Sequence, residues 1–217
     1  MQKYGVVFDF NGTLFWDTKL QNDSWDHFLH KYGFNLDEEQ KNKYVHGINA
    51  KDTFEYLFKR YLSADEVYNY TEEKEVVYRE MCLESGMELA PGAEDLIEYL
   101  LTNNVKIAIA TASAKNNVDF FIEQFDLLRF FKPENIIYND GTLRGKPHPD
   151  LFTKAIKVIG VPANRVTIFE DSLAGVEAAK NSGAGNVVIV NGSSDIFKSY
   201  NYQIINHFNQ FSRKNFQ

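Results

Sequence analysis

The sequence predicts an α/β protein whose core is a parallel β-sheet and whose first strand is followed by a large insertion. Segments of helical character separate five short apolar runs, which lie at residues 4–8, 105–110, 136–138, 166–169 and 187–190. Strands that alternate with helices form parallel sheets with right-handed crossovers. About a hundred residues separate the first two runs, whereas a crossover needs roughly a dozen or somewhat more. We therefore expect a Rossmann-like core with an inserted domain.

The insertion is predicted to be all-helical. Trp25, Phe28, Leu29 and Tyr32 follow the i, i+3, i+4, i+7 spacing of one helix face. After the insertion, Pro91 suits the first turn of a helix that restarts the main domain. We expect the core domain to comprise residues 1–16 and 87–217, and the helical domain to comprise residues 17–86.

Composition and charge exclude several classes of protein. The 217 residues are 44% hydrophobic and 15% aromatic, which is typical of a globular chain and not of a disordered one. The formal net charge is -7, and no cluster of lysine and arginine is long enough to follow a phosphate backbone. We therefore expect no nucleic-acid partner.

Cysteine usage and hydropathy indicate the compartment. Cys82 is the single cysteine, so the chain has no intramolecular disulfide and no cysteine-rich zinc site. No apolar run approaches the about 18 residues of a membrane span, and no signal-like segment opens the sequence. We expect a cytoplasmic protein without a membrane partner, as a monomer or weak homodimer.

Polar residues follow the first two predicted strands, at the sheet edge where parallel α/β proteins bind ligands. Asp9 ends the first run, and Thr111, Ala112 and Ser113 follow the second. Hydroxyl and backbone N–H groups at such a strand-to-helix turn can hold phosphate oxygens. The structural alternative is that Thr111 or Ser113 caps the next helix.

Charged residues near two other strands extend this pattern. Glu170 and Asp171 follow the fourth run, and adjacent acids at the end of a buried strand are costly without a cation or hydrogen bonds. A helix-start preference for acids explains one of them more easily than both, which favours magnesium. Lys146 lies in a turn stiffened by Pro147 and Pro149. Such a turn would fix a positive charge for phosphoryl transfer, unless Lys146 is a solvated loop residue.

Four motifs resemble those of the haloacid dehalogenase superfamily. They are DFNGT at 9–13, ATAS at 110–113, GKPHPD at 145–150 and IFEDSLAGVEAAKNSG at 168–183. The helical insertion after the first motif resembles the cap domain of the branch that contains β-phosphoglucomutase and phosphoglycolate phosphatase. The resemblance covers the whole chain and implies a phosphoryl-transfer enzyme with a cap.

The resemblance also implies roles for individual residues. Asp9 would be the nucleophile that forms an aspartyl-phosphate, and Thr111 and Lys146 would stabilise charge on the transferring group. Mg²⁺ would be held by the Asp9 and Asp171 carboxylates and the Asn11 backbone carbonyl, with Glu170 as a ligand or just behind one. The expected phosphate- and substrate-binding residues are Phe10, Thr111, Ala112, Ser113 and Lys146 in the core, and His46 and Lys51 in the cap.

Asn11 departs from the family pattern, which usually has an aspartate there as general acid and base. An amide cannot transfer the proton, and general acid–base help is worth about 10² to 10⁴ in rate. Three hypotheses follow. The substrate's leaving group needs little protonation, or a cap residue such as His46 supplies the proton, or the protein binds a phosphometabolite and turns it over slowly.

The leading prediction is a magnesium-dependent phosphatase acting on a small phosphorylated metabolite such as a sugar phosphate. A sugar phosphomutase is the alternative enzyme. It must move protons at two hydroxyls in each cycle, so the amide at Asn11 argues more strongly against a mutase than against a phosphatase. A catalytically weak binding protein is the alternative from another class. A dehalogenase is disfavoured, because attack at carbon does not call for acids at 170 and 171.

Overall fold

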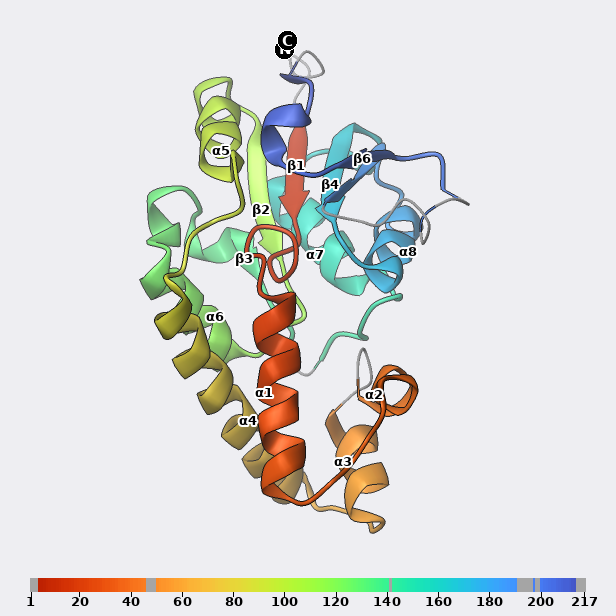
Figure 1. The fold of residues 1–217 in the computed structure, drawn as a ribbon. Helices are drawn as coiled ribbons and strands as arrows, with labels where there is room; N and C mark the ends of the chain where they lie inside the picture. Colours follow the sequence, from red (N-terminus) through yellow and green to blue (C-terminus); the bar gives the residue numbers. More distant parts are fainter. Residues whose placement is uncertain (1–3, 46–49, 141, 191–196, 198–199, 214–217) are drawn as a thin grey trace. The chain divides into compact units, whose positions relative to one another are not determined.

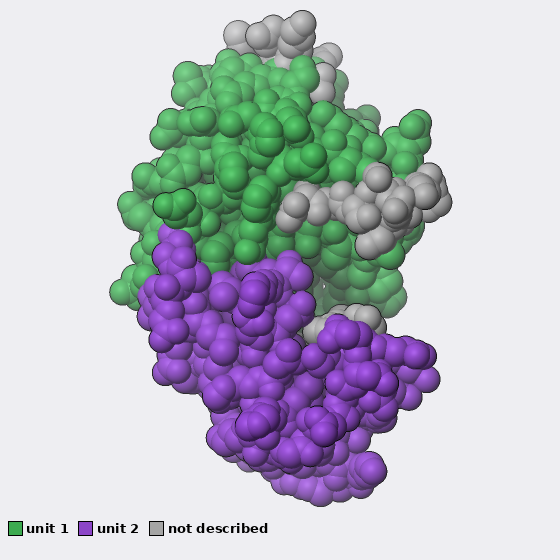
Figure 2. All heavy atoms as spheres, viewed as in Figure 1, with its two compact units in different colours: residues 1–16, 88–217 green, residues 17–87 purple. Residues whose placement is uncertain are grey.

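A computed structural model describes residues 4–45, 50–140, 142–190, 197 and 200–213. Its chain divides into two compact units, one formed by residues 1–16 and 88–217 and the other by residues 17–87 (Figure 2). No helix among the described residues is long and apolar enough to cross a bilayer.

The first unit is built on a six-stranded sheet in which all the pairings are parallel (Figure 1). The strand order is β3-β2-β1-β4-β5-β6. The strands are β1 (Gly5–Phe8), β2 (Lys106–Ala110), β3 (Ile136–Ile137), β4 (Val166–Glu170), β5 (Asn186–Val190) and β6 (Gln203–Ile205). The predicted α/β class and its five apolar strands are confirmed, and β6 is an additional edge strand.

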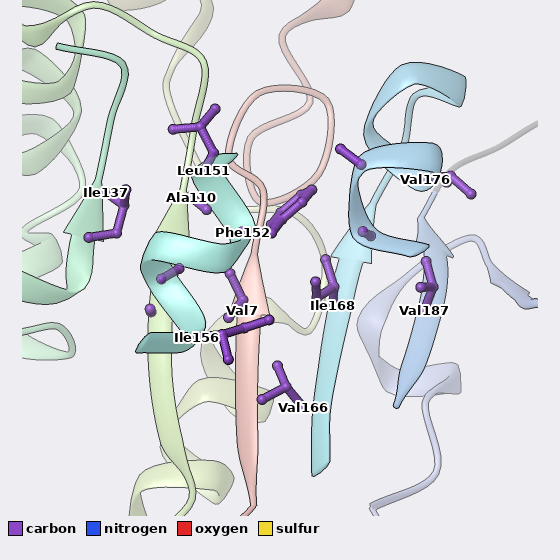
Figure 3. Packing of buried hydrophobic residues seen from close by; sticks show 14 of the residues in the cluster. Val7, Ala110, Ile137, Leu151, Phe152, Ile156, Val166, Ile168, Val176 and Val187 are labelled. Atoms are coloured by element: carbon purple, nitrogen blue, oxygen red, sulfur yellow. The ribbon is translucent and has the colours of Figure 1, made fainter. Parts of the chain in front are cut away.

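Helices connect the strands of this unit. They are α5 (Ala93–Thr102), α6 (Lys115–Gln124), α7 (Asp150–Ile159) and α8 (Leu173–Asn181). The apolar side chains of α7 and α8 cover one face of the sheet, where Phe152 and Val176 meet Val7 and Ile168 (Figure 3). Because successive strand residues point to opposite faces, Phe8 lies on the other face.

The second face carries an aromatic cluster. Phe8 and Phe169, neighbours on β1 and β4, stack with ring centroids 5.2 Å apart. Phe208 and Phe211 from the C-terminal segment pack on the Phe169 ring at 5.3 and 4.9 Å. Both faces of β1 and β4 are therefore buried, which fixes the position of the carboxyl ends of these two central strands.

The regular elements among the described residues of the second unit are all helices. Its helices are α1 (Thr18–Lys31), α2 (Glu38–Tyr44), α3 (Ala50–Phe58) and α4 (Ala64–Ser85). Phe28 and Leu29 of the predicted helix face are buried against Phe54 and Leu57. Capping boxes start α2 and α4, and Gly86 ends α4 in the left-handed conformation that glycine adopts without strain. The predicted all-helical insertion is therefore confirmed.

Candidate active site

Three carboxylates meet at the carboxyl ends of the two central strands. Asp9 follows β1 directly, Glu170 is the last residue of β4, and Asp171 comes next. β1 and β4 pair with Phe8 opposite Phe169, and the Asp9 N–H donates to the Phe169 carbonyl at 3.0 Å. One oxygen from each of the three acids lies within 4.8 Å of the others. Parallel pairing therefore gathers acids that lie far apart in the sequence.

Lys146 reaches the same cluster from the turn before α7. Its Nζ lies 2.5 Å from Asp9 Oδ1 and also contacts Glu170 Oε1. The Lys146 side chain is only 11% exposed, so the alternative of a solvated loop lysine is wrong. The stem passes the ring of Phe152, with Nζ 5.2 Å from the ring centroid. One ammonium thus contacts two of the three acids.

Burial and mutual repulsion dominate the electrostatics of this cluster. Burial raises the pKa of Asp9 to about 7, against the attraction of Lys146 and with added repulsion from Glu170. Burial also raises the pKa of Asp171 to about 8, with repulsion from Glu170 and Asp9. Burial lowers the pKa of Lys146, but the charges of Asp9 and Glu170 outweigh it and leave that pKa raised. Three acids against one ammonium favour a bound cation.

Hydrogen bonds distinguish the three acids. Glu170 is fully buried; its Oε1 contacts Lys146, and its Oε2 accepts from the Ser172 N–H at 2.6 Å and the Ser172 hydroxyl at 3.0 Å. Asp171 is partly buried and accepts from the Thr13 hydroxyl at 3.1 Å. Both Glu170 oxygens therefore accept from protein donors. Among the described residues, fewer protein donors contact the carboxylates of Asp9 and Asp171.

Two glycines make room for these carboxylates. A Cβ on Gly12 would overlap the Asp171 carboxylate, and Gly12 has φ +78°, which other residues rarely adopt. A Cβ on Gly175 would overlap the Glu170 carboxylate. Sequence reasoning did not assign roles to Gly175, Thr13 or Ser172. Their signal was their place inside the DFNGT and IFEDSLAGVEAAKNSG motifs, near the predicted acids.

A second group of side chains forms at the end of β2. Ser113 Oγ donates to Asn11 Oδ1 at 2.7 Å, and Thr111 Oγ1 donates to the same oxygen at 3.3 Å. Ala114 is the residue before α6 and makes no side-chain cap. The alternative in which Thr111 or Ser113 caps α6 is therefore wrong, because both hydroxyls contact Asn11.

The remaining predicted residues differ in what they can contribute. Phe10 is 1% exposed and its ring stacks on Phe121 at 4.6 Å, so the ring belongs to the core and not to a binding surface. Ala112 is exposed beside Thr111. Lys51 lies on α3 in the helical unit, with Nζ 3.9 Å from Glu55 and 4.8 Å from the Tyr61 ring centroid. His46 lies outside the described residues, so Lys51 and His46 stay predictions.

Beyond the central strands of the parallel sheet, three acids and a lysine therefore form a site that could hold a cation. The haloacid dehalogenase-like hydrolase family matches this chain over residues 6–190. The chain belongs to that family, as the four motifs indicated.

Relatives and solved structures agree with this membership. A phosphorylated carbohydrates phosphatase of Thermotoga maritima is 26% identical over 82% of this chain and 81% of its own length. (DL)-glycerol-3-phosphatase 2 of Arabidopsis thaliana is 30% identical over 88% of this chain and 81% of its own. The crystal structure of a HAD hydrolase, family IA, variant 3, from Entamoeba histolytica superposes with a TM-score of 0.89 at 32% identity. The superposition covers 100% of this chain and 97% of the Entamoeba histolytica chain.

Proposed function

We propose that the protein is a magnesium-dependent phosphatase that acts on a small phosphorylated metabolite through an aspartyl-phosphate on Asp9. The observation that carries the proposal is the contact of Lys146 with Asp9 within a cluster of three acids beyond β1 and β4. Family membership and relatives named as phosphatases of phosphorylated carbohydrates and of glycerol 3-phosphate support it.

Asp9 has the geometry of a positioned nucleophile. Its backbone is held by the bond to Phe169, and its Oδ1 by Lys146 at 2.5 Å. A carboxylate fixed in this way loses little orientational entropy when it attacks phosphorus. The Lys146 ammonium then stands beside the transferring group, where it offsets the phosphoryl charge together with backbone N–H groups near Phe10, Asn11 and Ala112.

The donor set fits a hard divalent cation. The Asp9 and Asp171 carboxylates and the Asn11 backbone carbonyl would hold Mg²⁺, and Glu170, whose oxygens meet Lys146 and Ser172, would stand beside them. When bound, the ion supplies positive charge to phosphoryl oxygens. We further propose that residues 17–87 act as a cap that excludes water, with Lys51 and His46 as substrate contacts.

The test is phosphate release from phosphorylated sugars, glycerol 3-phosphate, acyl phosphates and nucleotides, with magnesium and with chelator. Asp9→Asn should lower release below about a tenth of wild type and abolish the phosphoprotein, because an amide is no nucleophile. Asp126→Asn is the matched control, since Asp126 is exposed and its left-handed backbone suits asparagine. Turnover by Asp9→Asn above a tenth of wild type would exclude Asp9 as the nucleophile.

A protein that binds phosphometabolites but barely turns them over is the second candidate, and the amide at Asn11 favours it. In that case calorimetry would show magnesium-dependent binding of a phosphate ester for which no release is measurable.

A further inference from the structure

The carboxamide of Asn11 is oriented by two hydroxyl groups. Its Oδ1 accepts from Ser113 at 2.7 Å and from Thr111 at 3.3 Å. Thr111 Oγ1 also accepts the Ser113 N–H at 3.1 Å, which directs the threonine's own proton toward Asn11. The Oδ1 edge of the amide therefore faces the end of β2, and the Nδ2 edge lies on the opposite side of the same plane.

The two hydroxyls are themselves rigidly placed. Thr111 is 2% exposed, and its N–H donates to the Ile137 carbonyl at 2.9 Å, which continues the pairing of β2 with β3. Asn11 is two residues from Asp9, on the first turn after β1. A held amide thus occupies the place where the family usually has its acid and base.

An amide at this position limits the chemistry of the leaving group. Nδ2 can donate a hydrogen bond to a departing oxygen but cannot give up a proton to it. A departing alkoxide is strongly basic and needs that proton. A departing carboxylate, whose conjugate acid has a pKa of about 4, does not.

We propose that Asn11, positioned by Thr111 and Ser113, restricts the enzyme to phosphates whose leaving group departs as a stable anion, acyl phosphates above all. This inference rests on the proposed phosphatase function and names its substrate class. It distinguishes the chain from a phosphatase of alkyl esters, such as the glycerol-3-phosphatase to which it is similar.

The steps balance without a proton donor at residue 11. An Asp9 oxygen bonds to phosphorus as the bridging P–O bond breaks, and the electron pair leaves on the carboxylate product. Water then bonds to phosphorus, the Asp9–phosphorus bond breaks and its pair returns to Asp9. The proton released by water leaves with phosphate. Because no base at 11 assists this second step, the aspartyl-phosphate should accumulate.

The test compares kcat/KM for acetyl phosphate, a series of aryl phosphates and glycerol 3-phosphate, with Asp9→Asn as the blank for spontaneous hydrolysis. Wild type should favour acetyl phosphate over glycerol 3-phosphate by at least about 100-fold. Asn11→Asp should raise kcat/KM for glycerol 3-phosphate at least about tenfold, with a much smaller change in kcat/KM for acetyl phosphate, because kcat/KM reports the first step. Mass spectrometry of the intact protein should detect phosphoprotein when wild type is incubated with acetyl phosphate, and a smaller phosphorylated fraction for Asn11→Asp.

Ser113 is tested as a positioning residue. Ser113→Ala should lower acetyl phosphate turnover, and Ser113→Thr, which keeps the hydroxyl, should restore it. Ser182→Ala is the matched control, because its hydroxyl bonds the Ala179 carbonyl at the C-terminal end of α8, outside the acid cluster. Peptide mass spectrometry of residues 4–19 must show an intact amide at 11, since Asn-Gly sequences deamidate, although Gly12 N–H is engaged with the Phe15 carbonyl at 2.7 Å.

The outcomes separate the two proposals. Similar wild-type kcat/KM values for acyl and alkyl phosphates, or an equal rise of both kcat/KM values in Asn11→Asp, overturn the inference and leave the phosphatase function standing. Wild-type activity that tracks a deamidated fraction also overturns it. No release from any substrate overturns both.

Discussion

At the scale of single residues, Lys146 and Glu170 decide whether the acid cluster can exist. Glu170 is 0% exposed and receives a contact from Lys146 and two hydrogen bonds from Ser172. The lysine brings the only ammonium among the described residues that contacts these acids. A buried carboxylate without a charged or hydrogen-bonding partner is costly, so this lysine serves stability as well as chemistry.

Lys146→Met should lower the free energy of unfolding by about 3 kcal/mol, because it leaves two buried carboxylates without their cation. Magnesium should recover part of this loss by supplying positive charge at the same place. Urea unfolding with and without magnesium measures both effects. Lys154→Met is the control, since its exposed pair with Asp140 at 3.4 Å should contribute at most about 1 kcal/mol. A Lys146→Met protein as stable as wild type would show that the acids are held by other groups.

At the scale of elements, the pairing of α1 with α4 depends on a buried polar contact. Asp17 precedes α1 but makes no side-chain cap for it. Its Oδ2 instead accepts from the Tyr78 hydroxyl of α4 at 2.5 Å and from Gln21 at 3.3 Å. Burial, with the nearby Asp17 charge, holds the pKa of Tyr78 above its usual range. Because Asp17 and Tyr78 are both buried, the bond ties the first helix of the helical unit to its last.

Tyr78→Phe should therefore lower the free energy of unfolding by about 1 to 3 kcal/mol, since the buried Asp17 carboxylate loses a donor. Tyr68→Phe, on the same helix but 61% exposed, should change it by less than about 0.5 kcal/mol. Chemical denaturation followed by far-UV circular dichroism gives both values. Equal effects of the two substitutions would mean that the Asp17 contact contributes nothing to α1–α4 packing.

At the scale of the whole molecule, the acid cluster makes stability depend on pH and on cations. Asp9 and Asp171 have folded pKa values of about 7 and about 8, against 3.8 for an ordinary aspartate. Between pH 4 and 8 the metal-free folded state therefore binds more protons than the unfolded state. The contribution of these groups to stability then falls as pH rises through this range.

Asp171→Asn removes one of the two carboxyl groups that bind a proton in the folded state within this pH range. The unfolding free energy of the metal-free variant, relative to wild type, should rise steadily from pH 4 to pH 8. Magnesium should stabilise wild type more than the variant, because one ligand is lost. The control is Asp140→Asn. The Thr142 hydroxyl and N–H lower the Asp140 pKa to about 2. The effect of Asp140→Asn on the unfolding free energy should therefore stay constant from pH 5 to 8. A flat difference for Asp171→Asn would show that the 171 carboxyl titrates normally.

The sequence by itself determined the elements and the ends of the strands that matter. Apolar runs of strand length and the helical spacing around Phe28 are local patterns, and local patterns set element type. Parallel pairing places residues that follow neighbouring strands at one edge of the sheet. The strand pattern alone therefore predicts that Asp9, Glu170 and Asp171 lie together.

Only the tertiary structure decided the partners of those residues. Asn11 contacts the hydroxyls of Thr111 and Ser113, which lie about a hundred positions away in the sequence. Lys146 contacts Asp9, which lies 137 positions before it. The short edge strand β6, Gln203–Ile205, contains only two adjacent apolar residues and was not predicted. Such contacts depend on how helices and turns pack on the sheet, and a side chain's partner at long range is not encoded in its neighbours along the chain.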